Sequence, residues 1–271
     1  MSIKLTIIGA FTLTMIHIKS QREIKLIRES ALIVAEVLDA IEYAIRPGVS
    51  SYELNQLAER IIKKAKAKAA FKGYRISDLP PYPYAICASI NNIVVHGYST
   101  KNRILKDGDI IGIDVGVYKH GYYGDAARTY AVGKVSKQAL RLMEVTKSAL
   151  YNGIAKAIVG NRVGDISYAI METAHKNNMS VADNLTGHGV GKKLHEDPMI
   201  PNIGEMGKGP RLKAGMTLAI EPMFNIGGPE TIEHGWEFYT KDKSLSAHYE
   251  HTIVITNDGP QILSERVHNY G

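Results

Sequence analysis

Asp109-Ile-Ile-Gly-Ile-Asp-Val-Gly-Val117 is followed by Tyr118-Lys-His-Gly121 and then by a second run, Tyr122 to Val132. Both runs are strand-like, and the short Gly-containing break between them predicts an antiparallel hairpin. A turn centred on Lys119 and His120 would place Asp114 directly opposite Asp125. Like charges in that arrangement destabilise a hairpin, so the pair indicates a bound cation or, alternatively, two solvated aspartates at strand ends.

Three further residues favour the cation. Glu221 and Glu250 each interrupt an apolar, strand-like run, and His188 lies among glycines in Thr186-Gly-His-Gly-Val-Gly191. A lone histidine in such a loop is usually an ordinary loop residue. Charged side chains are seldom fully buried without a partner, and burying four carboxylates is costly unless a cation compensates them. The set predicts two metal ions and a metal-dependent hydrolase.

A short internal repeat supports this set. Leu105-Lys-Asp-Gly-Asp-Ile-Ile-Gly-Ile-Asp114 matches Leu212-Lys-Ala-Gly-Met-Thr-Leu-Ala-Ile-Glu221, with the acids Asp114 and Glu221 at the same point. The repeat predicts two related halves, about 15–133 and 134–271, with the metal site between them.

Helical patterns recur upstream of each copy of the repeat. Apolar residues from Ile24 to Ile45 step by three and four, which is typical of one helix face, and Ser50-x-x-Glu53 reads as a capping box that starts a second helix. Ala139 to Val159 and Asp165 to Asn177 predict a second pair of helices around the break Gly160-Asn-Arg-Val-Gly164. Each half therefore reads as helix, helix and then strands, which is an α+β fold.

The composition fits one enzyme domain. The chain has 271 residues, a net charge of +6 and a single cysteine, Cys87. One cysteine excludes an internal disulfide and a cysteine-rich zinc module. Lysines cluster between Arg60 and Lys72, and they form either a solvated helix face or a contact for a polyanion such as ribosomal RNA.

The N-terminus is apolar from Leu5 to Ile18, too short to span a bilayer comfortably. A degenerate signal peptide is one interpretation. We favour another, in which Met15 is the native start, residues 1–14 are an extension and residues 15–271 form the single catalytic domain.

These motifs, in this order, resemble the type I methionine aminopeptidases, which have the pita-bread fold. The resemblance covers essentially everything from about Met15 to the end. It is carried by Ser89-Ile-Asn-Asn92, Val95-His-Gly97, Gly108-Asp-Ile-Ile-Gly-Ile-Asp-Val115, Gly121 to Thr129, Gly187-His-Gly-Val-Gly191, Leu194-His-Glu-Asp-Pro198, Ala219-Ile-Glu-Pro222 and Leu245-Ser-Ala-His-Tyr-Glu-His-Thr252.

The resemblance implies a curved antiparallel sheet covered by helices, built from pseudo-two-fold duplicated halves. It also implies two divalent ions (Co, Mn, Fe or Zn) on the five residues singled out above: Asp114, Asp125, His188, Glu221 and Glu250. An oxygen-rich shell with one imidazole suits such ions.

Further roles come only from the resemblance. His195 would hydrogen-bond the substrate carbonyl or the tetrahedral intermediate, and His96 would contact the scissile amide nitrogen. The methionine side-chain pocket would be formed by Tyr82, Cys87, Leu194 and Trp236, and a monovalent cation would bind at Asn91, Ile93 and Ser246. Leu79 stands where many relatives have a tyrosine near the pocket.

The implied reaction is removal of the initiator methionine from nascent proteins whose second residue is small. Paired ions lower the pKa of a bridging water, the resulting hydroxide attacks the scissile carbonyl, and Glu221 shuttles the proton to the leaving nitrogen. The expected partners are nascent N-termini and, through the basic surface, the ribosome, with no DNA or membrane. We expect a cytoplasmic monomer.

Two alternatives stay open at this stage. An X-Pro peptidase of the same fold, of the prolidase or aminopeptidase P type, carries the same five ligand types, typically behind a large N-terminal domain. A peptide-binding pseudoenzyme is the other alternative, although such relatives usually lose metal ligands and all five are present here.

Overall fold

The computed structural model describes residues 16–76 and 78–266. The predicted extension 1–14 and the predicted start at Met15 lie outside these residues.

Four helices and fifteen strands make up the described part of the chain. The first half contributes α1 (Gln21–Ala44), α2 (Ser51–Lys64), β1 (Lys68–Ala69), β2 (Ile86–Ile90), β3 (Ile93–Val95), β4 (Ile110–Lys119) and β5 (Tyr122–Ala131). The second half contributes α3 (Lys137–Ile154), α4 (Val163–Lys176), β6 (Ser180–Val181), β7 (Thr186–Gly189), β8 (Glu196–Pro201), β9 (Thr217–Ile220), β10 (Met223–Asn225), β11 (Thr231–His234), β12 (Glu237–Thr240), β13 (Ser246–His248), β14 (His251–Thr256) and β15 (Gly259–Ile262).

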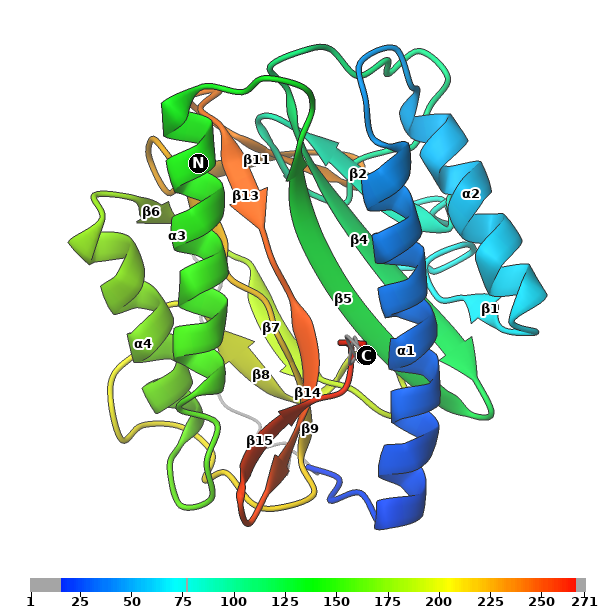
Figure 1. The fold of residues 1–271 in the computed structure, drawn as a ribbon. Helices are drawn as coiled ribbons and strands as arrows, with labels where there is room; N and C mark the ends of the chain where they lie inside the picture. Colours follow the sequence, from blue (N-terminus) through cyan, green and yellow to red (C-terminus); the bar gives the residue numbers. More distant parts are fainter. Residues whose placement is uncertain (1–15, 77, 267–271) are drawn as a thin grey trace, which may run out of the picture.

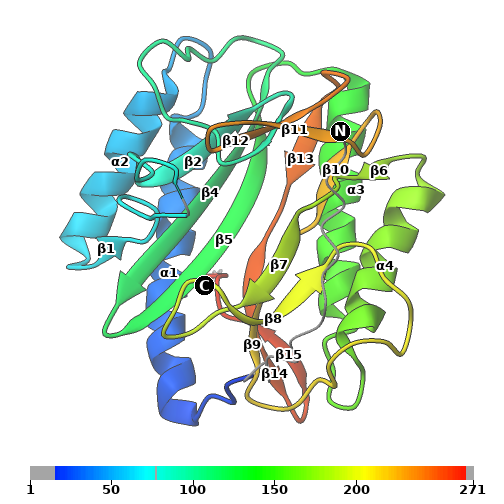
Figure 2. The same cartoon turned by 180° about the vertical axis from the view of Figure 1, so that it is seen from behind.

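The helices lie on one side of the strands. Figure 1 shows α1 and α2 over the strands of the first half and α3 and α4 over those of the second, and Figure 2 shows the opposite side, where the strands face the viewer. Two apolar cores fill the space between helices and strands, one under each helix pair. Among the described residues, no helix has the length and apolar character needed to cross a membrane.

The predicted hairpin is present, but its predicted register is wrong by two residues. β4 and β5 meet in a two-residue turn at His120 and Gly121, which both have positive φ, as a type I′ turn requires. Asp114 therefore faces Ala127, and Asp125 faces Gly116. Because side chains alternate with a period of two, Asp114 and Asp125 still lie on the same face of the sheet, as diagonal neighbours.

The predicted helices are also present, with shifted ends. The Ser50–Glu53 capping box is formed, and Ser20 with Glu23 forms another at the start of α1. α3 ends at Ile154 rather than at the predicted Val159, because the backbone tightens there into i→i−3 turn bonds such as that from the N–H of Lys156 to the carbonyl of Gly153.

The sequence repeat folds into the same turn twice. Gly108 and Gly215 have φ values of +94° and +89°. The N–H of Gly108 donates to the carbonyl of Val132, directly after β5, and the N–H of Gly215 donates to the carbonyl of Ile255 in β14. β5 and β14 pair with β4 and β9, the strands that follow the two turns. Asp114 lies within β4, and Glu221 comes directly after β9.

The two halves join at the centre through Glu250. Its N–H donates to the carbonyl of Ala127 at 2.8 Å, which connects it to β5. On its other side, His251 pairs with Ile220, and His248 pairs with Met223. The β10–β13 and β9–β14 ladders have the same register. Glu250 therefore lies opposite Glu221 in the gap between the two ladders.

Gly124 of β5 allows α1 to pack directly against the strand. A Cβ atom at this position would lie 2.4 Å from the backbone nitrogen of Ala31. We expect Gly124→Ala to lower the free energy of unfolding by about 2–3 kcal/mol, since overpacking against backbone cannot relax easily. Chemical denaturation measures this effect.

Gly112→Ala is the matched control, because a Cβ on Gly112 of β4 would meet nothing nearer than 3.6 Å. That change should alter stability by less than about 1 kcal/mol. Equal losses in the two variants would contradict the packing argument.

Candidate metal centre

A cavity of about 960 Å³ opens between the strands of the two halves. Its lining includes all five predicted metal ligands, each from a different strand or strand end: Asp114 (β4), Asp125 (β5), His188 (β7), Glu221 (after β9) and Glu250 (between β13 and β14). Antiparallel pairing of neighbouring strands therefore brings together residues that are far apart in the sequence.

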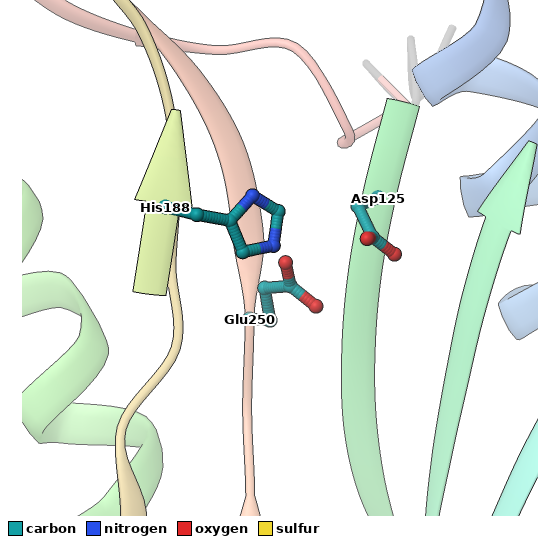
Figure 3. A group of neighbouring side chains, drawn as sticks. All are labelled: Asp125, His188 and Glu250. Carbon is teal, nitrogen blue, oxygen red and sulfur yellow. The ribbon is translucent and has the colours of Figure 1, made fainter. Parts of the chain in front are cut away.

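Three of these side chains converge closely. Asp125, His188 and Glu250 each offer a ligand atom, and the three atoms lie within 4.8 Å of one another. Figure 3 shows these side chains reaching from separate segments into a common space. Oε1 of Glu221 lies 3.5 Å from Nε2 of His188. Atoms bound at about 2.0–2.2 Å to a common ion lie roughly 3–3.5 Å apart.

Three of the four carboxylates each have one buried oxygen without a hydrogen-bond partner among the described residues. Oδ1 of Asp114, Oδ1 of Asp125 and Oε1 of Glu250 are buried and accept no hydrogen bond from the described residues. Buried polar atoms are normally hydrogen-bonded, and buried charges are normally paired or bound to metal. The donor set thus fits divalent cations.

Burial sets the protonation of these groups. It raises the pKa of Asp114 to about 7 and that of Glu221 to about 8. It also raises the pKa values of Asp125 and Glu250 well above the ordinary carboxyl range, and the neighbouring carboxylates add to this shift. A positive ion would reverse the effect by stabilising the charged forms.

The surroundings of His188 keep its imidazole neutral, which is the form that binds metal. Burial lowers its pKa to about 3. Nδ1 lies 2.9 Å from the carbonyl oxygen of Gly189. A carbonyl can only accept, so Nδ1 carries the proton and Nε2 presents its lone pair. A backbone carbonyl commonly orients metal-binding imidazoles in this way.

An apolar wall adjoins the carboxylates. Tyr82, Cys87, Leu194 and Trp236 pack with Phe71 in one cluster and line the same cavity. Cys87 is the direct cross-strand partner of Asp114, which joins this wall to the candidate metal centre. Burial raises the pKa of the Cys87 thiol well above its ordinary value, so Cys87 is a neutral wall residue.

The two remaining predicted histidines also line the cavity. His96 has a φ of +59°, and its buried Nδ1 has no partner among the described residues. His195 is exposed on the cavity wall, with its ring centroid 4.4 Å from that of His188.

The predicted monovalent-cation residues lie outside this cavity lining. The N–H of Ser246 donates to the carbonyl of Asn91 at 2.8 Å, and Ile93 lies in β3. The cation itself stays a prediction.

Comparisons with known proteins agree with this geometry. The sequence profile of metallopeptidase family M24 matches residues 25–257. The chain belongs to this family. Over 256 residues it is 49% identical to a methionine aminopeptidase of Aquifex aeolicus, covering 92% of this chain and 99% of that protein.

Solved structures of the M24 family share the fold. A crystal structure of a methionine aminopeptidase from Thermotoga maritima superposes with a TM-score of 0.90 at 42% identity, covering 93% of this chain and all of the other. A prolidase from Pyrococcus furiosus has a TM-score of 0.73 at 22% identity and is matched over 65% of its length. The architecture is the pita-bread fold of these M24 enzymes.

Sequence reasoning missed His248 in this M24 site. His248 is buried, lines the cavity, and places Nε2 3.4 Å from Oε2 of Glu221. The available signal was its position two residues before Glu250, since a spacing of two favours the same side of an extended chain.

Tyr74 and the Lys19–Glu196 pair were also missed. Tyr74 and Leu79 both lie against the apolar wall. The hydroxyl oxygen of Tyr74 is 2.7 Å from Nδ1 of His195. Nζ of Lys19 lies 2.8 Å from Oε2 of Glu196, with both side chains buried. No local pattern pairs residues 177 positions apart.

The raised carboxyl pKa values predict a pH-dependent response to metal. Without metal, these groups stabilise the fold in their protonated forms. That stability is fully present below the unfolded-state pKa of about 4 and is lost as pH rises through about 8. Divalent cations displace the protons, so Mn²⁺ should raise Tm more at about pH 8 than at about pH 5.5.

Asp125→Asn should weaken Mn²⁺ binding roughly 100-fold, and calorimetric titration measures it. Glu59→Gln is the control, because it changes a carboxylate outside the cavity lining.

For the pH dependence, a Mn²⁺-induced rise in Tm that is equal at both pH values would contradict this account of the centre.

The buried Lys19–Glu196 pair predicts a large effect from losing one partner. Lys19→Met leaves Glu196 buried without its cation, which should cost about 3–5 kcal/mol of unfolding free energy. Burial acts to raise the pKa of Glu196, but the Lys19 ammonium and the N–H of Lys193 outweigh it, so the pKa is lowered. This stability is present above the unfolded-state pKa and is lost as pH falls through the folded one.

Lys72→Met is the control, because Lys72 pairs with Glu59 on the surface, where such pairs are worth about 0–1 kcal/mol. Urea denaturation at several pH values compares the two variants, and an equal loss in both would show that the buried pair adds nothing.

Proposed function

We propose that this chain is a methionine aminopeptidase that removes the initiator methionine from nascent proteins whose second residue is small. The observation that carries the proposal is the set of carboxylates that converge in one cavity beside an apolar wall, three of them with a buried oxygen that accepts no hydrogen bond from the described residues. The identity and near-complete coverage shared with the Aquifex aeolicus methionine aminopeptidase support it.

The carboxylates and His188 hold divalent cations, two in our proposal. When bound, such ions generate a nucleophile from water at neutral pH and polarise the scissile carbonyl. Glu221 takes the proton from the attacking water and passes it to the leaving nitrogen. Its two oxygens lie 3.5 Å and 3.4 Å from Nε2 of His188 and of His248, respectively, so its carboxyl group lies in the cavity beside the proposed ligand His188.

The apolar wall selects the side chain. A thioether packs well against aromatic rings and sulfur, and here Tyr82, Trp236 and Cys87 supply both. The wall is rigidly built: the Trp236 indole donates to the carbonyl of Pro80 at 2.7 Å, and the Tyr82 hydroxyl donates to that of Gly97 at 2.8 Å. His195 contacts the substrate carbonyl, and His96 contacts the scissile nitrogen.

An X-Pro peptidase is the rival of the same fold. The sequence identities disfavour it, since the chain is 49% identical to the Aquifex aeolicus aminopeptidase but only 22% identical to the prolidase.

We also propose that the enzyme acts as a cytoplasmic monomer on chains emerging from the ribosome. The basic surface supports the ribosome contact. Five lysines around the end of α2 are exposed: Lys63, Lys64, Lys66, Lys68 and Lys72. Such a cluster suits a polyanion.

The deciding experiment is release of free methionine from Met-Ala-Ser in Mn²⁺ or Co²⁺. Glu221→Gln should reduce the rate by roughly 10²–10⁴-fold, because it removes the proton shuttle, and a chelator should abolish release. Glu59→Gln is the control and should match the unaltered protein.

Ala-Pro peptides test the rival function under the same conditions. Cleavage of Ala-Pro without release of methionine would favour an X-Pro peptidase. Failure with both substrates, despite bound metal, would favour the peptide-binding alternative.

A further inference from the structure

The imidazole of His195 has a single hydrogen-bonding contact within the part of the chain that the structure describes. Its Nδ1 lies 2.7 Å from the hydroxyl oxygen of Tyr74, and that hydroxyl has no other protein partner there. The ring is exposed on the cavity wall. A neutral imidazole in water exchanges between two tautomers, so this one contact decides which nitrogen carries the proton.

The neighbouring His188 shows the opposite arrangement. Its Nδ1 faces a carbonyl oxygen, which can only accept, so that nitrogen is protonated. Nδ1 of His195 instead faces a phenol hydroxyl, which donates readily. If Nδ1 of His195 carried the proton, the Tyr74 hydroxyl hydrogen would have no protein acceptor among the described residues.

Tyr74 is held in place from both sides. The N–H of Gly73 donates to the carbonyl of Tyr82 at 2.7 Å, and the N–H of Tyr82 donates to that of Tyr74 at 2.9 Å. The Tyr74 ring also packs at 6.4 Å from that of Trp236. The hydroxyl is therefore aimed by the same segment that builds the apolar wall.

We propose that Tyr74 is a positioning residue that donates its hydroxyl hydrogen to Nδ1 of His195 and thereby keeps the proton of that imidazole on Nε2. Nε2–H is then the group available to donate to the substrate oxygen as negative charge develops on it. The catalytic part of this inference rests on the proposed function, whereas the tautomer itself does not.

Nitrogen-15 NMR of the imidazoles tests the tautomer directly, in protein loaded with diamagnetic Zn²⁺. The His195 signals, assigned with His195→Ala, should show an unprotonated Nδ1 and a protonated Nε2. Tyr74→Phe should shift them toward a mixture of tautomers. A protonated Nδ1 in the unaltered protein, or identical spectra in the variant, would overturn the proposal.

Kinetics on Met-Ala-Ser tests the consequence. Tyr74→Phe keeps the aromatic ring, so kcat should fall roughly tenfold, the worth of one hydrogen bond, with KM changed less than about twofold. Tyr84→Phe is the matched control and should keep the full kcat, since it removes a hydroxyl that makes no hydrogen bond within the described residues.

The double variant separates positioning from a merely structural role. In a His195→Ala background, Tyr74→Phe should have no further effect on kcat, because the partner is gone. Additive losses, or a rise in KM alone, would overturn the positioning role. If no variant releases methionine while the tautomer shift is still seen, the proposed function fails and the tautomer assignment stands.

Discussion

Mutual repulsion among four carboxylates is the constraint on which the rest of the structure depends. Asp114, Asp125, Glu221 and Glu250 project into one cavity from neighbouring strands, and hydrogen-bonded backbone ladders fix their positions. Side chains carried on such ladders cannot separate without breaking strand pairs. Protonation or a bound cation must therefore offset the repulsion. The fold thus favours a metal site at this position.

The two faces of β5 have different roles: one packs against α1, and the other faces the cavity. Glycine at position 124 brings α1 against the backbone of β5, while the next residue, Asp125, points to the opposite face and into the cavity. Because side chains alternate between the two faces of a strand, adjacent residues can serve different roles: position 124 packs against α1, and position 125 faces the cavity. The two-residue turn at His120 and Gly121 sets the register of the hairpin that carries both aspartates.

The segment around Tyr74 connects the apolar wall to His195. It packs on Trp236 in the apolar wall, and its hydroxyl meets His195 at the rim of the metal centre. Cys87 makes a second link, because it lies directly opposite Asp114 in the sheet. In the proposed function, recognition of the substrate side chain and chemistry at the carbonyl therefore depend on shared elements.

The sequence alone predicted the helices, the hairpin and the five metal-binding candidates, because helix periodicity, capping boxes and isolated acids in apolar runs are local signals. It also determined that Asp114 and Asp125 share a face, since an error of two residues in register preserves side-chain parity. The register itself, the approach of His248 to Glu221 and the pairing of Lys19 with Glu196 became visible only in the folded chain. Those contacts depend on how distant segments meet, and no local pattern encodes that meeting.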